Sequence, residues 1–225
     1  MTRFVRLMMV GVLAGTLGML GCGSDDTATG GSGGTGGTGG TGGGGDVICG
    51  EGQSIDPSFT TGTGSVECDG LGVVQVPIEV VLAAKPMGDV SPSEATDFDV
   101  QIQFIIDEDT VGTLGNFVQV AEIGAASADV ANSAGDGTVN VPAQTPCLSD
   151  FTADTDDNGT PGPVVVTTPV EAGAWTAVDG SVVLEATEMT FTIISPVPLT
   201  LSTTGDEPAC TWLTLPTVSF DVPTP

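Results

Sequence analysis

The 225-residue chain contains 29 acidic and three basic side chains and no histidine, which gives a formal net charge of −26 at pH 7. This balance excludes nucleic acid as a partner, because binding to it depends largely on lysine and arginine side chains that neutralise phosphates. It does not indicate a disordered chain: 40% of the residues are hydrophobic and only 14% are charged, whereas disordered segments combine low hydrophobicity with high charge.

The start of the chain has the polarity order of a secretory signal peptide. Arg3 and Arg6 form a short positive region, and the apolar run Leu7–Leu20 follows it. This run is too short for a helix that crosses a bilayer, which needs about 20 residues. It ends at Gly21 and Cys22 without the small-x-small site at which an ordinary signal peptide is cleaved.

The tetrapeptide Met19-Leu20-Gly21-Cys22 resembles the bacterial lipobox. In that motif a small residue precedes a cysteine that receives a diacylglyceryl thioether before the signal peptide is removed. Gly21 and Cys22 match the pattern, whereas Met19 stands where Leu is usual and Leu20 where a small residue is more common. The resemblance implies that residues 1–21 are a lipoprotein signal peptide and that Cys22 carries the lipid.

The resemblance also implies a partner and a location. The lipid bilayer of a bacterial cell envelope would hold the mature chain through Cys22, because two or more acyl chains anchor a protein stably where one does not. The residue after Cys22 is Gly23. In lipoproteins of enteric bacteria, Asp at this position favours retention in the inner membrane. Gly23 therefore favours the outer membrane, at its periplasmic face or at the cell surface. The alternative is an uncleaved membrane anchor with an incidental cysteine.

Residues 22–45 are expected to form a flexible linker. Within them, Thr27–Gly45 reads TATGGSGGTGGTGGTGGGG and contains a Gly-Gly-Thr triplet repeat. A coil of about 20 such residues has an r.m.s. span near 25 Å. The repeat is either a spacer that holds the following domain away from the membrane or a neutral low-complexity expansion.

The cysteines provide a second line of argument. If Cys22 carries lipid, four remain, and an even number in an oxidising compartment indicates two disulfides. Three pairings are possible, and proximity in the sequence favours Cys49–Cys68 with Cys147–Cys210. A loop of about 20 residues closed in this way would contribute around 3 kcal/mol. A zinc site is disfavoured because the chain has neither a CxxC pair nor a histidine.

Residues 46–225 are predicted to form a single domain rich in β-strands. Three runs, 74–82, 98–106 and 189–193, alternate apolar and other residues with the period of two that marks a strand with one buried face. Pro77 places the first of them at a sheet edge or a bulge. Further strands are expected at 117–123, 138–141, 163–169, 173–178, 181–187, 197–202 and 211–222.

Turn signals separate these runs. Asp179-Gly180 predicts a hairpin, and other turns are expected at 107–109, 135–137 and 205–207. The best helix candidate is 119–134, where alanines cluster. Together the pattern predicts an all-β fold: an antiparallel β-sandwich of Ig-like architecture. Its two tryptophans, Trp175 and Trp212, are expected to pack in the core or at its rim; the alternative is a binding platform.

One local motif resembles the opening of an EF-hand calcium loop, Asp154-Thr155-Asp156-Asp157-Asn158-Gly159-Thr160. Hard cations prefer oxygen ligands, and the glycine permits the sharp turn that gathers them. The predicted ligands are the side chains of Asp154, Asp156 and Asn158 and the carbonyl of Thr160.

The resemblance stops at that point. Val165 replaces the bidentate Glu, and Pro161 and Pro163 forbid the helix that would follow. A complete EF-hand is excluded. Two interpretations stay open: a calcium loop in a β-protein, aided by Asp150 or Glu171, and an exposed turn without metal.

Catalytic side chains are scarce. Without histidine there is no Ser-His-Asp or Cys-His arrangement, and Lys85 is the only lysine. We therefore expect a non-enzymatic binding or structural module with a protein or glycan partner that the sequence does not identify. The alternative is a carboxylate-dependent hydrolase that acts on envelope or extracellular polysaccharide through a pair of acids.

Overall fold

The computed structural model describes Cys49 and residues 54–70, 74–133, 137–141, 146–154, 159–196, 198–205 and 209–222. All of these residues belong to one compact unit, Gly44–Pro225. None of the helices in this described part is long and apolar enough to span a membrane.

Strands dominate the described residues, and helix α1 (Glu108–Gly115) is short. In chain order the strands are β1 (Thr60–Gly70), β2 (Val74–Pro86), β3 (Thr96–Ile106), β4 (Val120–Asn132), β5 (Thr138–Val141), β6 (Cys147–Asp150), β7 (Val164–Thr167), β8 (Glu171–Trp175), β9 (Ser181–Ser195), β10 (Leu199–Ser202), β11 (Cys210–Thr214) and β12 (Thr217–Asp221).

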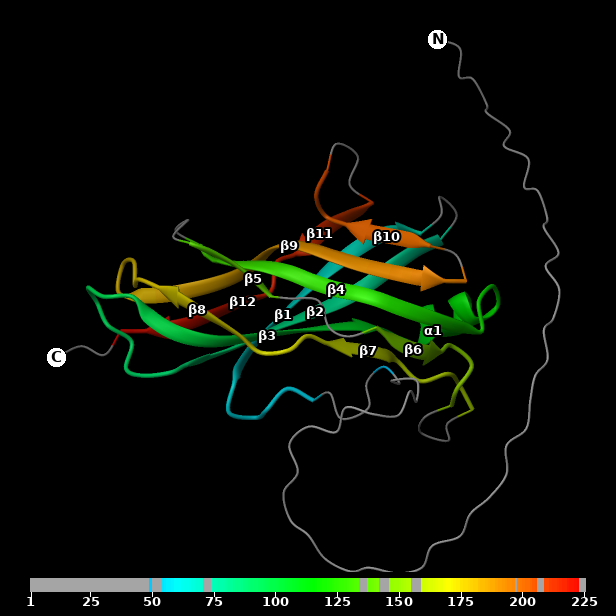
Figure 1. Ribbon diagram of the computed structural model, residues 1–225, viewed down its shortest axis with the longest axis horizontal. Coiled ribbons are helices and arrows are strands. Elements are labelled where there is room, and N and C mark those ends of the chain that lie inside the picture. Colours follow the sequence, from blue (N-terminus) through cyan, green and yellow to red (C-terminus); the bar gives the residue numbers. More distant parts are fainter. Residues whose placement is uncertain are drawn as a thin grey trace, which may run out of the picture. The chain divides into compact units, whose positions relative to one another are not determined.

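These strands form two sheets in which every pairing is antiparallel. The first has the order β11-β1-β2-β3-β7, and β8 also pairs with β3. The second has the order β10-β9-β4-β5, and β12 and β6 pair with β9 and β4. In Figure 1, β4 and β9 run side by side in one layer while β1 and β2 cross behind them in the other. The two packed antiparallel sheets confirm the predicted antiparallel β-sandwich architecture.

Several sheet edges are built from two short strands against one long neighbour. Along β3, β7 pairs with residues 103–106 and β8 with residues 96–100. In the other sheet, β6 and β5 divide one edge of β4, and β10 and β12 divide one edge of β9. Pro169 lies between β7 and β8, where a residue without an N–H cannot continue the ladder. Short edge strands present few unpaired backbone groups to other chains.

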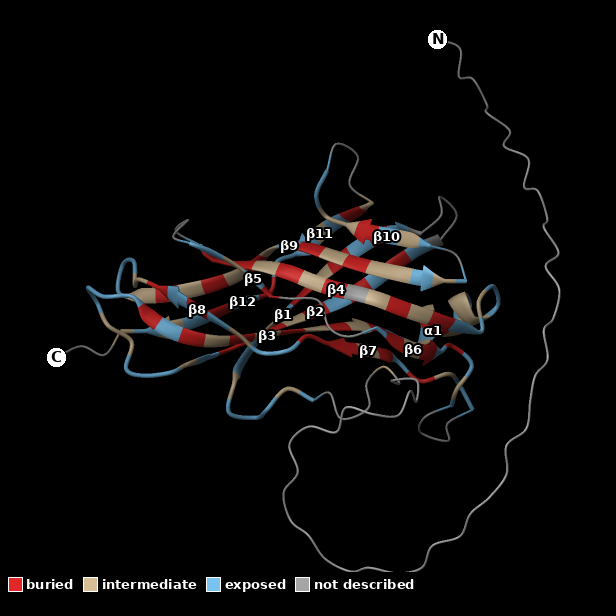
Figure 2. Cartoon of the chain, in the orientation of Figure 1, coloured by how far each residue is buried: buried red, intermediate tan, exposed pale blue. Residues whose placement is uncertain are grey.

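The hydrophobic core lies between the sheets. Buried and less buried residues alternate along the strands in Figure 2, as expected where one face packs inward. Aromatic rings join the layers: Phe104 of β3 lies 6.1 Å from Phe191 of β9, and Phe98 lies 5.0 Å from Phe220 of β12. Burial of this apolar surface is the main stabilising contribution to the fold.

Both tryptophans pack as predicted. Trp175 is 1% exposed, and its indole N–H donates to the carbonyl oxygen of Gly137 at 3.2 Å. Trp212 of β11 is partly buried and donates to the carbonyl of Thr187 in β9 at 3.1 Å. The Trp212 bond connects a strand of one sheet to a strand of the other.

The chain passes from one sheet to the other between β11 and β12. This crossing segment, residues 214–217, lies directly against β1. A Cβ atom at Gly64 would be 2.5 Å from the carbonyl oxygen of Thr214, and one at Gly62 would overlap the carbonyl oxygen of Thr217. Backbone therefore fills the inward positions of β1 that side chains occupy in other strands.

The helix predicted at 119–134 is wrong, because this segment forms strand β4. Its buried positions begin with Ala121 and Ile123 and continue with Ala126, Ala128 and Val130. Register shifts between 122 and 125 move the alternation from odd to even numbers, which obscures the period of two. Pairing with β9 on one side and with β5 and β6 on the other overrides the helical preference of alanine.

Other boundaries differ in smaller ways. The predicted strand 211–222 is two strands, β11 and β12, and residues 181–195 form the single long strand β9. Strands β1 and β6 were not predicted. Pro77 lies in β2, which is internal to its sheet, but the pairing with β3 covers only residues 79–86. Pro77 therefore pairs only with β1, and the predicted sheet edge is confined to this end of β2.

The turn predictions have mixed outcomes. At the Asp179-Gly180 hairpin, the φ angles are 52° and 84° and Val178 pairs with Ser181, as a type I′ turn requires. At 107–109 the chain instead begins α1, with Asp107 as the N-cap. Gly137 and Gly205 have positive φ angles, while the remainder of the other two predicted turns lies outside the described residues.

Candidate functional site

The four cysteines beyond Cys22 form two disulfides, as predicted, but the favoured pairing is wrong. The bonds join Cys49 to Cys147 and Cys68 to Cys210. They close loops of 98 and 142 residues. In the chain-entropy model a loop of 100 residues contributes about 4.7 kcal/mol, more than the short loops expected from the sequence.

Sheet topology explains this pairing. Cys68 and Cys210 are register partners on the neighbouring strands β1 and β11. The backbone N–H of Cys49 donates to the carbonyl of Leu148 at 2.8 Å, which holds Cys49 beside Cys147 at the start of β6. Strand neighbours in a sandwich are distant in the sequence, so proximity in the sequence was a poor guide.

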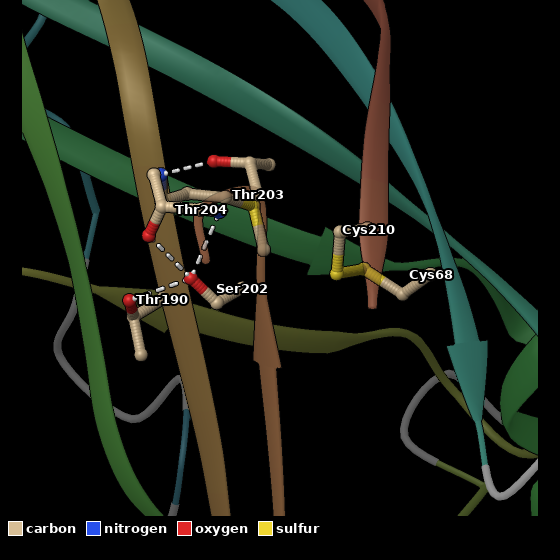
Figure 3. The surroundings of a disulfide bond; sticks show 7 residues. Cys68, Thr190, Ser202, Thr203, Thr204 and Cys210 are labelled. Carbon is tan, nitrogen blue, oxygen red and sulfur yellow. Dashed lines mark hydrogen bonds between the residues drawn. A yellow bond between two sulfur atoms is a disulfide. The ribbon is translucent and has the colours of Figure 1, made fainter. Parts of the chain in front are cut away.

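Hydroxyl groups fix the chain after β10, in the segment that leads toward Cys210 (Figure 3). The Ser202 hydroxyl lies 3.0 Å from that of Thr204 and accepts a bond from the Thr204 backbone N–H at 3.2 Å. The Thr203 hydroxyl accepts from the N–H of Met189 in β9 at 2.9 Å. These local bonds hold the turn against β9.

Three consecutive acidic residues lie at the start of α1. Asp107 caps the helix by accepting from the backbone N–H of Thr110 at 2.7 Å, and Glu108 and Asp109 follow in the first turn. Negative side chains at this position interact favourably with the helix dipole. Asp107, Glu108 and Asp109 line an open hollow of about 370 Å³ together with Ile105 and Pro163.

The segment that contains the predicted calcium loop closes against α1. A Cβ at Gly115, the last residue of α1, would lie 2.7 Å from the carbonyl oxygen of Phe151. Gly162 donates its backbone N–H to the carbonyl of Ala153 at 2.9 Å. The loop therefore leaves and returns at nearly the same point, beside the helix.

The structure describes the two ends of the predicted calcium loop. The carboxylate of Asp154 accepts a hydrogen bond from the backbone N–H of Gly159 at 2.7 Å, and Gly159 has a φ angle of 87°. Thr160 is exposed. Asp156 and Asn158 lie outside the described residues, so their positions do not test the ligand set. Among the described residues, no group of three or more acidic or cysteine side chains is placed to hold a metal.

The two auxiliary acids named from the sequence lie on different strands. Asp150 ends β6, and Glu171 begins β8 opposite Val100 of β3. Asp150 accepts bonds from the hydroxyl and the backbone N–H of Thr152, at 2.6 and 2.8 Å. Hydrogen bonding from the Thr152 side chain, then from its backbone, lowers the pKa of the Asp150 carboxyl, because these bonds favour the charged form.

A second group of polar residues lies on the strands β4, β5 and β9. Asp129 and Glu188 are register partners, and the amide of Asn140 donates to Asp129 at 2.7 Å. These three side chains line a small hollow of about 90 Å³ together with Ser127 and Thr190. Sequence reasoning missed this carboxylate pair, because it depends on the register between β4 and β9.

Lys85 lies near the end of β2, beside the start of β1, where Ala84 pairs with Thr60. Its ammonium group donates to the Ser58 hydroxyl at 3.3 Å. Hydrogen bonds from the backbone and side chain of Ser58 lower the pKa of Asp56, and the Lys85 charge adds to this effect.

Cys22 and the rest of residues 1–48 lie outside the described residues, so the structure does not test the predicted lipid site. Comparison with known proteins adds no identity: no protein-family model matches the chain, and no curated protein matches it.

Proposed function

We propose that this chain is a bacterial lipoprotein whose β-sandwich is a binding or structural module of the cell envelope. In this proposal residues 1–21 are the signal peptide, Cys22 carries the lipid and residues 22–45 are the tether. Cysteine pairing is the observation that carries the proposal. The other four cysteines bond to one another, which leaves Cys22 without a disulfide partner in the chain.

The disulfides also support the compartment. Structural disulfides form in oxidising environments outside the cytoplasm and are rare within it. A lipoprotein that is exported before it folds would meet such an environment. The outer membrane, at either of its faces, is the location that Gly23 favours in the lipobox resemblance.

Charge determines which partners suit the module. Once residues 1–21 are removed, Lys85 is the only basic side chain against 29 acids, a formal charge of −28 (1 − 29). Such a domain is repelled by anionic surfaces and stays soluble beside them. This favours a neutral or basic protein or a glycan as the partner, and the lipid as the only strong attachment to the membrane.

The carboxyls of Asp56 and Asp150 are unsuited to act as the acid of the hydrolase alternative. A glycosidase acid requires a raised pKa, whereas Asp56 and Asp150 have lowered ones. The proposal also includes an Ig-like form of the sandwich and calcium binding by the loop at 154–160.

Replacement of Cys22 by serine tests the anchor. In cells fed a labelled fatty acid, we expect Cys22→Ser to abolish the label on the protein and to leave residues 1–21 attached, because the thioether cannot form. A matched control, Cys68→Ser with Cys210→Ser, also removes thiols but should keep the label. Undiminished labelling of Cys22→Ser would overturn the proposal.

A second variant separates the lipid from the leader. If residues 1–22 are replaced by an ordinary cleavable signal peptide, the exported protein should appear in the soluble fraction, because nothing else in the chain is proposed to hold the membrane. Retention of this variant in the membrane fraction would contradict the claim that lipid is the attachment.

A further inference from the structure

The two disulfides interleave along the chain. In sequence order the cysteines are 49, 68, 147 and 210, and the bonds join the first to the third and the second to the fourth. Each bond therefore skips over a cysteine of the other. Neither bond joins consecutive cysteines.

The native partners meet only after most of the chain is available. Cys68 needs β11, at residues 210–214, as its neighbour on β1. Cys49 needs β6, at residues 147–150, which is itself held by pairing with β4. Both Cys68 and Cys210 are almost fully buried, at 0% and 2% exposure, so their bond belongs to the completed sandwich.

Loop closure favours a different pairing before the sandwich forms. Cys49 and Cys68 are 19 positions apart (68 − 49), whereas Cys49 and Cys147 are 98 apart. Because the free energy of closing a flexible loop grows as (3/2)RT ln n, the short loop is favoured by about tenfold. The same comparison favours Cys147–Cys210 over Cys68–Cys210 by about threefold.

Export would strengthen this preference. A chain that crosses a membrane from its N-terminus presents Cys49 and Cys68 to the oxidising compartment before Cys147. A bond between them would prevent Cys68 from reaching Cys210 and Cys49 from reaching Cys147. The incorrect pair must then be exchanged before β1 and β6 can take their native neighbours.

We infer that this protein is a substrate of a separate dithiol protein with disulfide-isomerase chemistry. With Cys22 blocked by lipid, a chain in which the other four cysteines are oxidised has no thiol of its own to begin the exchange. This step rests on the proposed function. An external thiolate supplies the missing nucleophile.

The exchange is redox-neutral. The isomerase thiolate attacks the Cys68 sulfur, forms a mixed disulfide and releases Cys49 as a thiolate. Cys49 attacks the Cys147 sulfur, which forms Cys49–Cys147 and releases Cys210 as a thiolate. Cys210 attacks Cys68, forms the second native bond and returns the isomerase thiolate. Three bonds form and three break, with no net oxidation.

Oxidation of the reduced chain tests this inference. Full-length Cys22→Ser protein is reduced, unfolded and returned to native buffer with diamide, an oxidant that contains no thiol. Disulfides are mapped by mass spectrometry of a non-reduced digest. We expect mainly Cys49–Cys68 and Cys147–Cys210. After the diamide is removed, addition of a reduced bacterial disulfide isomerase should raise the native pairs at least tenfold. A majority of native pairs with diamide alone would overturn the inference.

A matched variant isolates the competition between cysteines. In Cys22→Ser protein that also has Cys49→Ser and Cys147→Ser, Cys68 and Cys210 have no alternative partner. Their bond should form equally with and without the isomerase, whether or not the variant folds fully. If this variant depends on the isomerase as strongly, the effect is not disulfide exchange and the inference fails. Lipid labelling of Cys22 is measured separately, so failure of either proposal is distinguishable from failure of the other.

Discussion

Gly64 shows how a single residue in β1 determines the approach of the crossing segment. A side chain there would meet the carbonyl oxygen of Thr214 and the ring of Pro216, each 2.5 Å from the added Cβ. Both neighbours include backbone or a rigid ring, so neither can move aside without shifting the crossing segment. Gly64 does not have a positive φ angle. Glycine is required here because there is no room for a side chain.

We therefore predict that Gly64→Ala destabilises the fold by about 1–3 kcal/mol, the usual range for an overpacked core. Gly88→Ala is the control, because a Cβ at Gly88 meets nothing within 4 Å, and it should change stability by less than about 0.5 kcal/mol. Urea denaturation of both variants measures the difference. Equal stability of the two would show that the crossing segment does not lie against β1.

The carboxyl of Asp150 provides a residue-scale test of pH dependence. Its pKa is lowered chiefly by the hydroxyl of Thr152. A lowered folded-state pKa stabilises the protein above the unfolded-state pKa, and this contribution is lost as the pH falls through the folded-state value. Asp150 is exposed, so the effect on stability is small and the pKa itself is the better measurement.

In Thr152→Val the Asp150 pKa should rise toward the ordinary value, because the bond from the side chain is removed. Thr152→Ser keeps a hydroxyl and should keep the lowered pKa. Titration of the Asp150 carboxyl by NMR between about pH 6 and pH 2 follows both variants. An identical titration of the valine and serine variants would contradict the assigned cause.

At the scale of elements, the sequence predicted strands whose inward positions hold large apolar side chains. Strands β2, β3 and β9 have this pattern. Strand β1 was missed because its inward positions include Gly62 and Gly64, which are covered by backbone, and β4 was obscured by its bulges and small alanines. A period of two is visible only when side chains fill the core and the register is unbroken.

The candidate sites also differ in whether a local sequence pattern predicts them. The sequence identified Asp154 and its loop because a metal-ligand pattern is local. It could not identify Asp129 beside Glu188, or the cysteine pairing, because both depend on which strands become neighbours. The register between strands that are distant in the sequence depends on the topology of the sheet. A short sequence pattern contains no information about that topology.

The loop at 154–160 is the element whose interpretation is open to direct test. If it binds calcium, the metal stabilises the folded state that binds it, and the melting temperature should rise by several degrees between EDTA and calcium. Asp154→Asn should then abolish the rise, whereas Asp89→Asn, outside the loop, should not. An unchanged melting temperature with no calcium heat in calorimetry would leave the loop as an exposed turn.

At the scale of the whole molecule, three features converge on one arrangement. Two disulfides consume four of five cysteines, a glycine-rich segment separates the fifth from the sandwich, and the folded domain is strongly acidic. In the proposed arrangement, anionic membranes repel the acidic domain and the lipid on Cys22 holds it beside one. We therefore propose that the chain is attached through Cys22, with the surfaces of the sandwich available to a partner.

Attachment through Cys22 is tested by the mass of the N-terminal peptide of the protein extracted from membranes with detergent. We expect a chain that begins at Cys22 and has the added mass of a diacylglyceryl group, with or without a further acyl chain. A chain that retains residues 1–21, or that begins elsewhere with an unmodified N-terminus, would contradict it.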